Sequence, residues 1–294
     1  MKYDNHPFSE QEVFIEGVFL EGVQSALSNF VLPDEDVMAL GYVNPVAGAP
    51  DEALQGEVTV NRFIVSDVDP LVDYFVGDFE GHFNYDEENV FVFKKGHMTD
   101  YSCYCTINEV PELNASFKIF GNMEGVAKTA AIVEDNPVTN IYLPAAGDLK
   151  LQITDIAGGT TIDVDTNAVQ SFDYRIQMDW QPLYTVGAVE PQGYLLNGGA
   201  LIETIVEIEL NDSIPPNFQA LVCSPVLKDL VLEAKACGSQ CEKGDEKVVR
   251  RFSSPCSKLI EYNQLGGVGE VLTAEIVFKS NSTSLAGLKA LVTL

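Results

Sequence analysis

Positive charge is scarce in this chain. Its 294 residues include 17 Lys and Arg against 44 Asp and Glu, so the formal net charge is −27. Each contact with a nucleic-acid phosphate needs a Lys or Arg, and the balance therefore argues against a protein that wraps or grips nucleic acid. It remains compatible with a surface past which DNA slides without binding.

Histidine is also rare, and the three present are His6, His82 and His97. None lies beside a Ser or Cys in a recognisable nucleophile pattern, which argues against a hydrolytic triad. A pocket that combined His82 or His97 with carboxylates would indicate an enzyme, but strand patterns do not place these residues. We therefore predict no catalytic residues, no cofactor, no bound metal and no enzymatic activity.

Long apolar runs are missing as well. No run approaches the roughly 18 apolar residues that a membrane span requires, and residues 1–7 have neither the apolar core nor the cleavage site of a secretion signal. We expect a soluble protein without a membrane partner, made in a cytoplasm.

The chain has six cysteines, and such a compartment favours reduced thiols. Cys103 and Cys105 are two residues apart on a predicted strand, so they share a face and do not easily bond to each other. For Cys237, Cys241 and Cys256 three interpretations stay open: structural thiols, a disulfide, or a metal site. The spacing matches no paired CxxC or Cys/His framework.

Strand patterns dominate the sequence. Gln55 to Val65 and Leu201 to Leu210 alternate apolar and polar residues, as half-buried strands do. Asp69-Pro70 followed by apolar residues predicts an N-cap and one short helix, which Gly77 ends. These patterns predict an all-β protein with a short helix beside the strands.

An internal repeat divides the chain. With an offset of 146 positions, Val23-Gln24-Ser25 aligns with Val169-Gln170-Ser171, Gly41 with Gly187, and Pro45 with Pro191. A repeat at half the chain length indicates duplication. We predict two tandem β-sandwich domains, residues 1–146 and 147–294, each with a short flanking helix.

The repeated segment resembles phage tail tube proteins. The likeness rests on "VQSFDYRIQMDWQPLYTVGAVEPQG" followed by "ALIETIVEIELND", and on a weaker version in the first half, "GVQSALSNFVLPDEDVMALGYVNP", "DPLVDYFVG" and "NVFVF". The resemblance implies a structural virion protein, a major tail tube subunit, in which each half is one tube domain. Three chains would then form a pseudo-hexameric ring, and rings would stack into a hollow tube with an acidic lumen for DNA passage.

The same resemblance implies partners and a location. The first partner is the chain itself; others are a tape-measure protein, a tail terminator and a sheath, and double-stranded DNA would pass through unbound. The location would be the virion tail, assembled in the host cytoplasm. Strand alternation then suggests lumen residues, namely Ser28, Asp34, Asp36, Asp173, Arg175 and Asp179. Apolar self-assembly candidates are Phe30, Val37, Met38, Leu183 and Tyr184.

Other interpretations remain. The same duplicated domain would suit a tail ring or baseplate hub that does not polymerise, or another β-rich virion protein. From a different class, a pair of carbohydrate-binding or adhesive β-sandwiches would require an exposed aromatic cluster. Leu285, Leu288 and Leu291 lie at helical spacing near the C-terminus, where the segment either reaches a neighbour or packs on its own domain.

Overall fold

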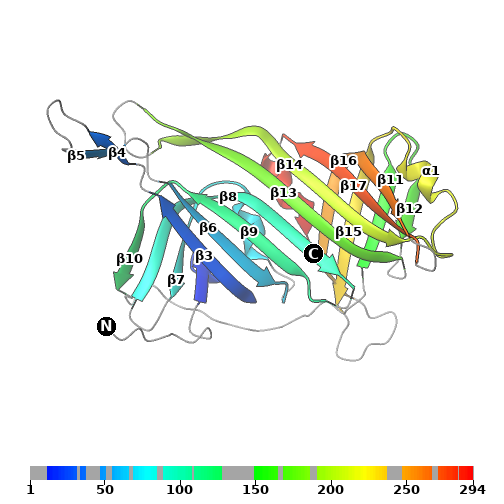
Figure 1. The fold of residues 1–294 in the computed structure, drawn as a ribbon, viewed down its shortest axis with the longest axis horizontal. Helices are drawn as coiled ribbons and strands as arrows, with labels where there is room; N and C mark the ends of the chain where they lie inside the picture. Colours follow the sequence, from blue (N-terminus) through cyan, green and yellow to red (C-terminus); the bar gives the residue numbers. More distant parts are fainter. Residues whose placement is uncertain are drawn as a thin grey trace.

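The protein is built almost entirely of antiparallel β-strands (Figure 1). The computed structural model describes residues 12–31, 34–37, 47–50, 55–65, 69–84, 89–107, 109–127, 149–164, 168–185, 191–236, 247–266, 271–283 and 285–293. Within these ranges the helical elements are short: η2 (Pro70–Phe75), α1 (Phe218–Val222), α2 (Leu285–Leu288) and η3 (Lys289–Leu291). The prediction of an all-β fold is confirmed.

The first half contains ten strands in the described residues. They are β1 (Glu12–Ile15), β2 (Val18–Phe19), β3 (Val23–Val31), β4 (Asp34–Val37), β5 (Ala47–Pro50), β6 (Gln55–Phe63), β7 (Phe79–Asn84), β8 (Asn89–Thr106), β9 (Glu112–Ile119) and β10 (Met123–Ala127). Strands β4 and β5 form a separate two-stranded hairpin. The others pair in the order β3-β6-β9-β8, and the N-terminal part of β8 also pairs with β7 and β10.

The second half follows the same plan. Its strands are β11 (Leu149–Asp155), β12 (Thr161–Val164), β13 (Val169–Leu183), β14 (Gly193–Glu209), β15 (Lys228–Ala236), β16 (Lys247–Leu265), β17 (Thr273–Ser282) and β18 (Val292–Thr293). They pair in the order β13-β14-β17-β16, and the N-terminal part of β16 also pairs with β15 and β18. Strand order therefore matches between the halves. The predicted boundary at 146/147 lies outside the described residues.

Irregular positions also recur between the halves. The β3–β6 ladder shifts register between Val23 and Ser25, and the β13–β14 ladder shifts between Val169 and Ser171. The ladders of β8 with β9 and of β16 with β17 shift at Thr99 and Ile260, which are 161 positions apart. Bulges are tied to local backbone geometry, so their recurrence gives a residue-by-residue alignment of the two halves.

A second recurrence marks the bend in each long strand. Lys95 and Cys256, again 161 positions apart, have positive φ angles of 56° and 52°. A left-handed residue is costly for a side chain with a Cβ, and here it lets one strand change partners without ending. Strand β8 thus leaves β7 and joins β13, and β16 pairs first with β15 and then with β17.

The two halves are joined by strand pairing. Residues Asp100 to Thr106 of β8 pair antiparallel with Ser171 to Gln177 of β13. The main sheet therefore runs without a break through eight strands, in the order β3-β6-β9-β8-β13-β14-β17-β16. The sequence predicted two sandwiches but did not predict this continuous sheet between them.

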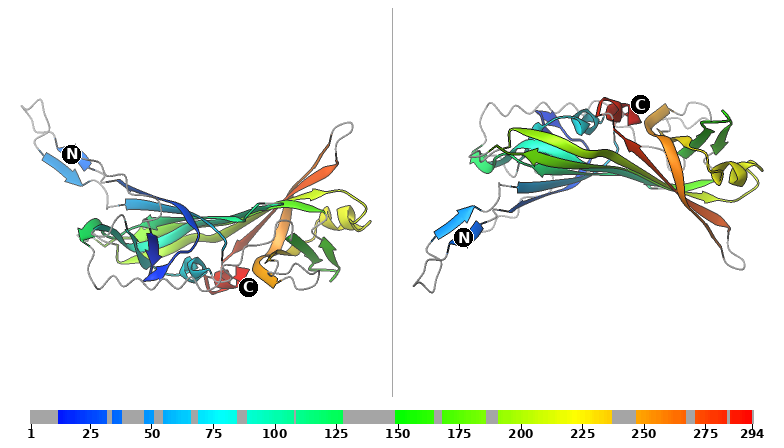
Figure 2. Two further views of the ribbon diagram at one scale, coloured as in Figure 1. Left: turned by 90° about the horizontal axis from the view of Figure 1, so that it is seen from below. Right: turned by 90° about the horizontal axis from the view of Figure 1, so that it is seen from above.

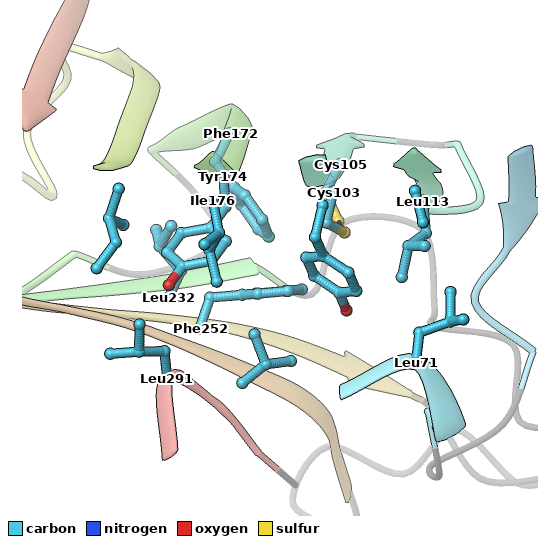
Figure 3. Packing of buried hydrophobic residues seen from close by; sticks show 14 of the residues in the cluster. Leu71, Cys103, Cys105, Leu113, Phe172, Tyr174, Ile176, Leu232, Phe252 and Leu291 are labelled. Carbon is cyan, nitrogen blue, oxygen red and sulfur yellow. Dashed lines mark hydrogen bonds between the residues drawn. The ribbon is translucent and has the colours of Figure 1, made fainter. Parts of the chain in front are cut away.

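A second layer covers one face of the main sheet. In Figure 2, η2, α2 and the β11–β12 hairpin all lie on the same side of it. Alternate side chains on β13, such as Phe172, Tyr174 and Ile176, are buried against this layer. Figure 3 shows them beside Phe252 of β16 and near Cys103 of β8, so one hydrophobic core crosses the joint between the halves.

The C-terminal segment packs on its own chain. Leu288 and Leu291 are buried, and Val292 pairs with Phe252 through β18. Lys289 Nζ lies 3.2 Å from Asp73 Oδ1 on η2, which links the segment to the first half. Of the two alternatives for this segment, packing within the chain is the one observed.

Candidate functional site

One face of the main sheet is left uncovered by the second layer in the described residues, and we call it the open face. Side chains on β13 alternate between buried and partly exposed, so Asp173, Arg175, Gln177 and Asp179 point to this face. Cross-strand register carries the face through the sheet, because directly paired residues share a face.

Carboxylates outnumber cations on the open face. Its acidic residues are Glu57, Asp100, Glu112, Asp173, Asp179, Glu203, Glu207, Glu209, Glu261 and Glu275, and its basic residues are Lys118, Arg175, Lys258 and Lys279. The face therefore carries a share of the chain's excess negative charge. A concentration of one sign on one face gives a field that repels anions over about a Debye length of 8 Å at physiological salt.

Four of these residues form a ladder of charges across adjacent strands. Arg175 Nη2 lies 2.6 Å from Asp100 Oδ2, and Lys279 Nζ lies 2.8 Å from Glu203 Oε1. Glu203 is also the direct cross-strand neighbour of Arg175. The ladder connects β8, β13, β14 and β17, so it links strands from both halves.

Two pKa values are shifted at this place, that of Asp173 beside the ladder and that of Arg175 within it. Burial raises the pKa of the Asp173 carboxyl; Arg175 opposes this rise, whereas Glu203 and Asp100 add to it. A hydrogen bond to Asp100 raises the pKa of the Arg175 guanidinium. Arg175 therefore stays positively charged. It offsets the repulsion among the carboxylates of Asp100, Asp173 and Glu203.

The structure brings together some of the predicted lumen residues and separates others. Asp173, Arg175 and Asp179 share the open face, as strand alternation predicted. Ser28 is exposed but pairs with the buried Val58, so it lies on the opposite face of β3. Asp34 and Asp36 belong to the separate β4–β5 hairpin, where their side chains lie outside what the structure describes.

Two strand edges lie at the ends of the main sheet. Within the described residues, β3 pairs only with β6, and the C-terminal part of β16 pairs only with β17. Exposed leucines occur on both strands: Leu27 on β3 is 69% exposed and Leu265 on β16 is 53% exposed. Unpaired edges with apolar side chains are typical sites of strand addition.

The predicted self-assembly residues are placed as follows. Phe30 belongs to β3 and Val37 to β4, in both cases with the side chain outside the described residues, and Met38 lies entirely outside them. Leu183 and Tyr184, at the end of β13, are 51% and 42% exposed. Phe30 is the one that belongs to an edge strand of the main sheet.

A cleft of about 960 Å³ opens on the sheet, with lining residues from both halves. They include Asn29, Glu57, Lys118, Gln177, Asp179 and Asn197. Neither His82 nor His97 belongs to the lining. His97 is instead buried among aromatic rings, with its centroid 5.1 Å from Trp180 and 3.9 Å from Tyr194, and His82 stacks on Phe14.

The described cysteines are free thiols. Cys103 and Cys105 are buried with their Sγ atoms 3.9 Å apart, and Cys223 and Cys256 are exposed. Cys237 and Cys241 lie outside the described residues. Over the described ranges, no group of three His, Cys, Asp or Glu side chains is placed to hold a metal ion. No helix among them is long and apolar enough to cross a membrane.

Sequence reasoning missed Glu203 and Lys279 of the ladder, and Leu27 and Leu265 at the edges. A second offset, of 161 positions, would have found Lys279 from Lys118 and Leu265 from Tyr104. Lys118 and Lys279 are 161 positions apart, and so are Phe117 and Phe278. That offset aligns β9 with β17 and hence β8 with β16.

No family model matches the chain, and no curated protein matches it.

Proposed function

We propose that this chain is a structural subunit of a phage tail tube, which assembles into trimeric rings of six repeats. The observation that carries the proposal is the joint between the halves, where β8 pairs with β13. Their counterparts in the repeat are β16 and β3, the strands with unpaired edges in the described residues. The chain thus contains one such pairing, and its two free edges, β16 and β3, are the counterparts of the strands that form it. Such a chain is suited to closing a ring head to tail, with β16 of one chain beside β3 of the next.

The dimensions allow such a ring to pass DNA. Eight strands per chain and three chains give about 24 strands, which at a spacing of about 4.8 Å and a tilt near 45° form a barrel roughly 50 Å across. Side chains reduce the opening to about 40 Å. A duplex roughly 20 Å across, with grooves about 8 Å deep, fits within it.

The electrostatics favour the open face as the lumen. The second layer covers the other face, so the uncovered one is available to a channel. Asp173, Arg175 and Asp179 would then line it, with the other carboxylates of the open face around them. Phosphates are repelled by such a wall, and DNA passes without being held.

The remaining partners follow from the family resemblance. We assign the chain to the virion tail, assembled in the host cytoplasm, with contacts to a tape-measure protein, a terminator and a sheath. Stacking of rings distinguishes a tube subunit from the alternative of a single hub or tail ring.

Negative-stain electron microscopy of the purified chain at increasing concentration tests the proposal. We expect rings with a central hole that stack into tubes. Rings that never stack would replace the tube subunit by a hub or tail ring, and a compact monomer at every concentration would contradict the proposal.

A matched pair of variants separates edge pairing from general surface effects. Leu27→Asp combined with Leu265→Asp places carboxylates on both free edges, where like charges that face each other oppose pairing, whereas Val76→Asp combined with Ile156→Asp places two on exposed apolar residues that follow η2 and β11. Rings should disappear in the first variant and persist in the second. Equal loss of rings in both variants would argue against assembly through the edge.

A further inference from the structure

The joint inside the chain provides a template for a joint between chains. Across it, Tyr104 lies opposite Asp173, Ser102 opposite Arg175, and Asp100 opposite Gln177. This pairing is antiparallel and continues the core on one face and the open face on the other. A second joint of the same kind therefore has a defined register, not only a defined pair of strands.

Because the two halves align residue by residue, the register of β8 with β13 predicts a register for β16 with β3. Strand β3 aligns with β13 at an offset of 146, because Ser25 pairs with Asn61 and Ser171 pairs with Glu207 after the same bulge. Strand β16 aligns with β8 at an offset of 161, which the bulges at Thr99 and Ile260 define. Asp173 thus corresponds to Leu27, and Tyr104 corresponds to Leu265.

We propose that a second copy of this chain pairs its β16 edge with the β3 edge of the first, with Leu265 opposite Leu27, Asn263 opposite Asn29 and Glu261 opposite Val31. The proposal rests on the self-assembly part of the proposed function. It adds the partner surface and the register, which a ring alone does not specify.

The side chains at the edges fit this pairing. Leu27 pairs with Thr59 and Leu265 with Thr273 inside the chain, so both leucines lie on the open face. Each is more than half exposed in the single chain. The proposed register brings the two into direct contact and removes apolar surface from water at both edges.

The composition of β3 also indicates that a partner strand covers its free edge. Its sequence, VQSALSNFV, has no charged residue and no proline. Proteins normally protect a solvent-exposed edge strand with such residues, since a long uncharged edge promotes uncontrolled aggregation. Strand β3 thus has the character of a strand paired on both sides.

Disulfide crosslinking between separately prepared chains tests the register. Leu27→Cys chains are mixed with Leu265→Cys chains that carry a mass tag, allowed to assemble and mildly oxidised. We expect the crosslinked heterodimer as the main new product, in excess of the native-cysteine background measured with unmodified chains. Native mass spectrometry of the same samples reports assembly independently.

Two controls define the register. Tyr104→Cys with Asp173→Cys in one chain should form the equivalent bond within the chain, because these positions are direct neighbours. Ser28→Cys chains mixed with Leu265→Cys chains should not crosslink, because Ser28 lies on the other face.

The outcomes are distinguishable. Crosslinking at Leu27 and Leu265 in assembled chains supports the register. Rings that assemble but crosslink only at a shifted pair, such as Leu27 with Asn263, overturn the register and leave the ring intact. Chains that remain monomeric overturn both this inference and the proposed function.

Discussion

Arg175 and Asp100 form an ion pair across the joint between the two halves, with Arg175 Nη2 2.6 Å from Asp100 Oδ2. It joins β13 to β8 on the open face, at the centre of the charge ladder. The pair is partly exposed, so its contribution to stability is modest and sensitive to salt.

Replacing Arg175 by Gln should therefore lower the free energy of unfolding by about 0.5–1 kcal/mol at low ionic strength, with the loss shrinking as salt is added. Urea denaturation at several salt concentrations measures this. Arg251→Gln, which breaks the pair of Arg251 with Glu233 inside the second half, is the matched control. A loss above about 2 kcal/mol that salt does not change would show that the pair is not the exposed contact described here.

Introducing the missing cation at the proposed joint between chains should strengthen assembly. Asn29 corresponds to Arg175 and Glu261 to Asp100, so Asn29→Arg places a cation beside the neighbouring chain's Glu261. We expect half-assembly at roughly two- to fivefold lower protein concentration, which corresponds to a surface ion pair of about 0.5–1 kcal/mol. Sedimentation across a concentration series measures the shift.

The control for that gain is Asn29→Gln, which adds length without charge. Adding Glu261→Gln to Asn29→Arg should remove the gain. A gain that survives the loss of Glu261 would mean that the new cation acts elsewhere.

Asp69 balances a buried cation in the first half. Its Oδ1 lies 3.4 Å from Arg62 Nη2 and accepts a hydrogen bond from the Leu71 backbone N–H, and its Oδ2 accepts one from the Tyr101 hydroxyl. Asp69→Asn keeps oxygen for the η2 cap but removes the charge, leaving Arg62 buried without a counter-ion among the described residues. We expect a loss of about 3–5 kcal/mol in the free energy of unfolding.

Thermal and urea denaturation measure that loss. Asp73→Asn is its control, because Asp73 is 74% exposed and pairs with Lys289 at the surface, where about 1 kcal/mol or less is at stake. If the two variants were equally stable, Asp69 would not have the structural role assigned to it.

His97 should make stability fall in mild acid. Burial lowers its pKa below the ordinary value of 6.5, although the Lys95 carbonyl and Asp78 oppose the shift. Its neutral form is therefore favoured by folding. Well above pH 6.5 both states are neutral and stability is complete, whereas as the pH falls through 6.5 the unfolded chain takes up the proton more readily and stability declines.

His97→Gln should reduce the loss of stability between about pH 7.5 and about pH 5.5 by on the order of 1 kcal/mol, whatever its effect at neutral pH. Denaturation midpoints of both proteins at the two pH values measure the difference in slope. Identical slopes would assign the acid sensitivity to other groups.

Local patterns predicted several strands and the short capped helix. Alternation in Gln55 to Val65 appears as β6, and the Asp69-Pro70 signal appears as the capped η2. Alternation on β13 also placed Asp173, Arg175 and Asp179 on one face. These features depend on residues close together in sequence, where side-chain period and capping chemistry decide the outcome.

Long-range features were not accessible from local patterns. Lys94-Lys95-Gly96 looks like a break between strands, yet β8 continues through it because Lys95 takes a left-handed conformation. The same occurs at Cys256 in β16. The β8–β13 joint pairs residues about 70 positions apart, and no turn or spacing signal marks it.

Trp180 illustrates a residue whose environment depends on tertiary structure. Sequence alone does not decide whether this residue of β13 lies in a core, at a rim or in an interface. It is only 5% exposed, and its Nε1 donates to the Met98 backbone oxygen at 2.7 Å. That bond reaches from β13 to β8, so the residue belongs to the joint between the halves.

A three-dimensional reconstruction of the assembled ring by cryo-electron microscopy tests the central claim most directly. We predict three chains around one continuous barrel, with β16 of each chain beside β3 of the next and with Asp173, Arg175 and Asp179 facing the channel. Chains that contact one another through other elements, or a ring with the open face turned outward, would contradict the account.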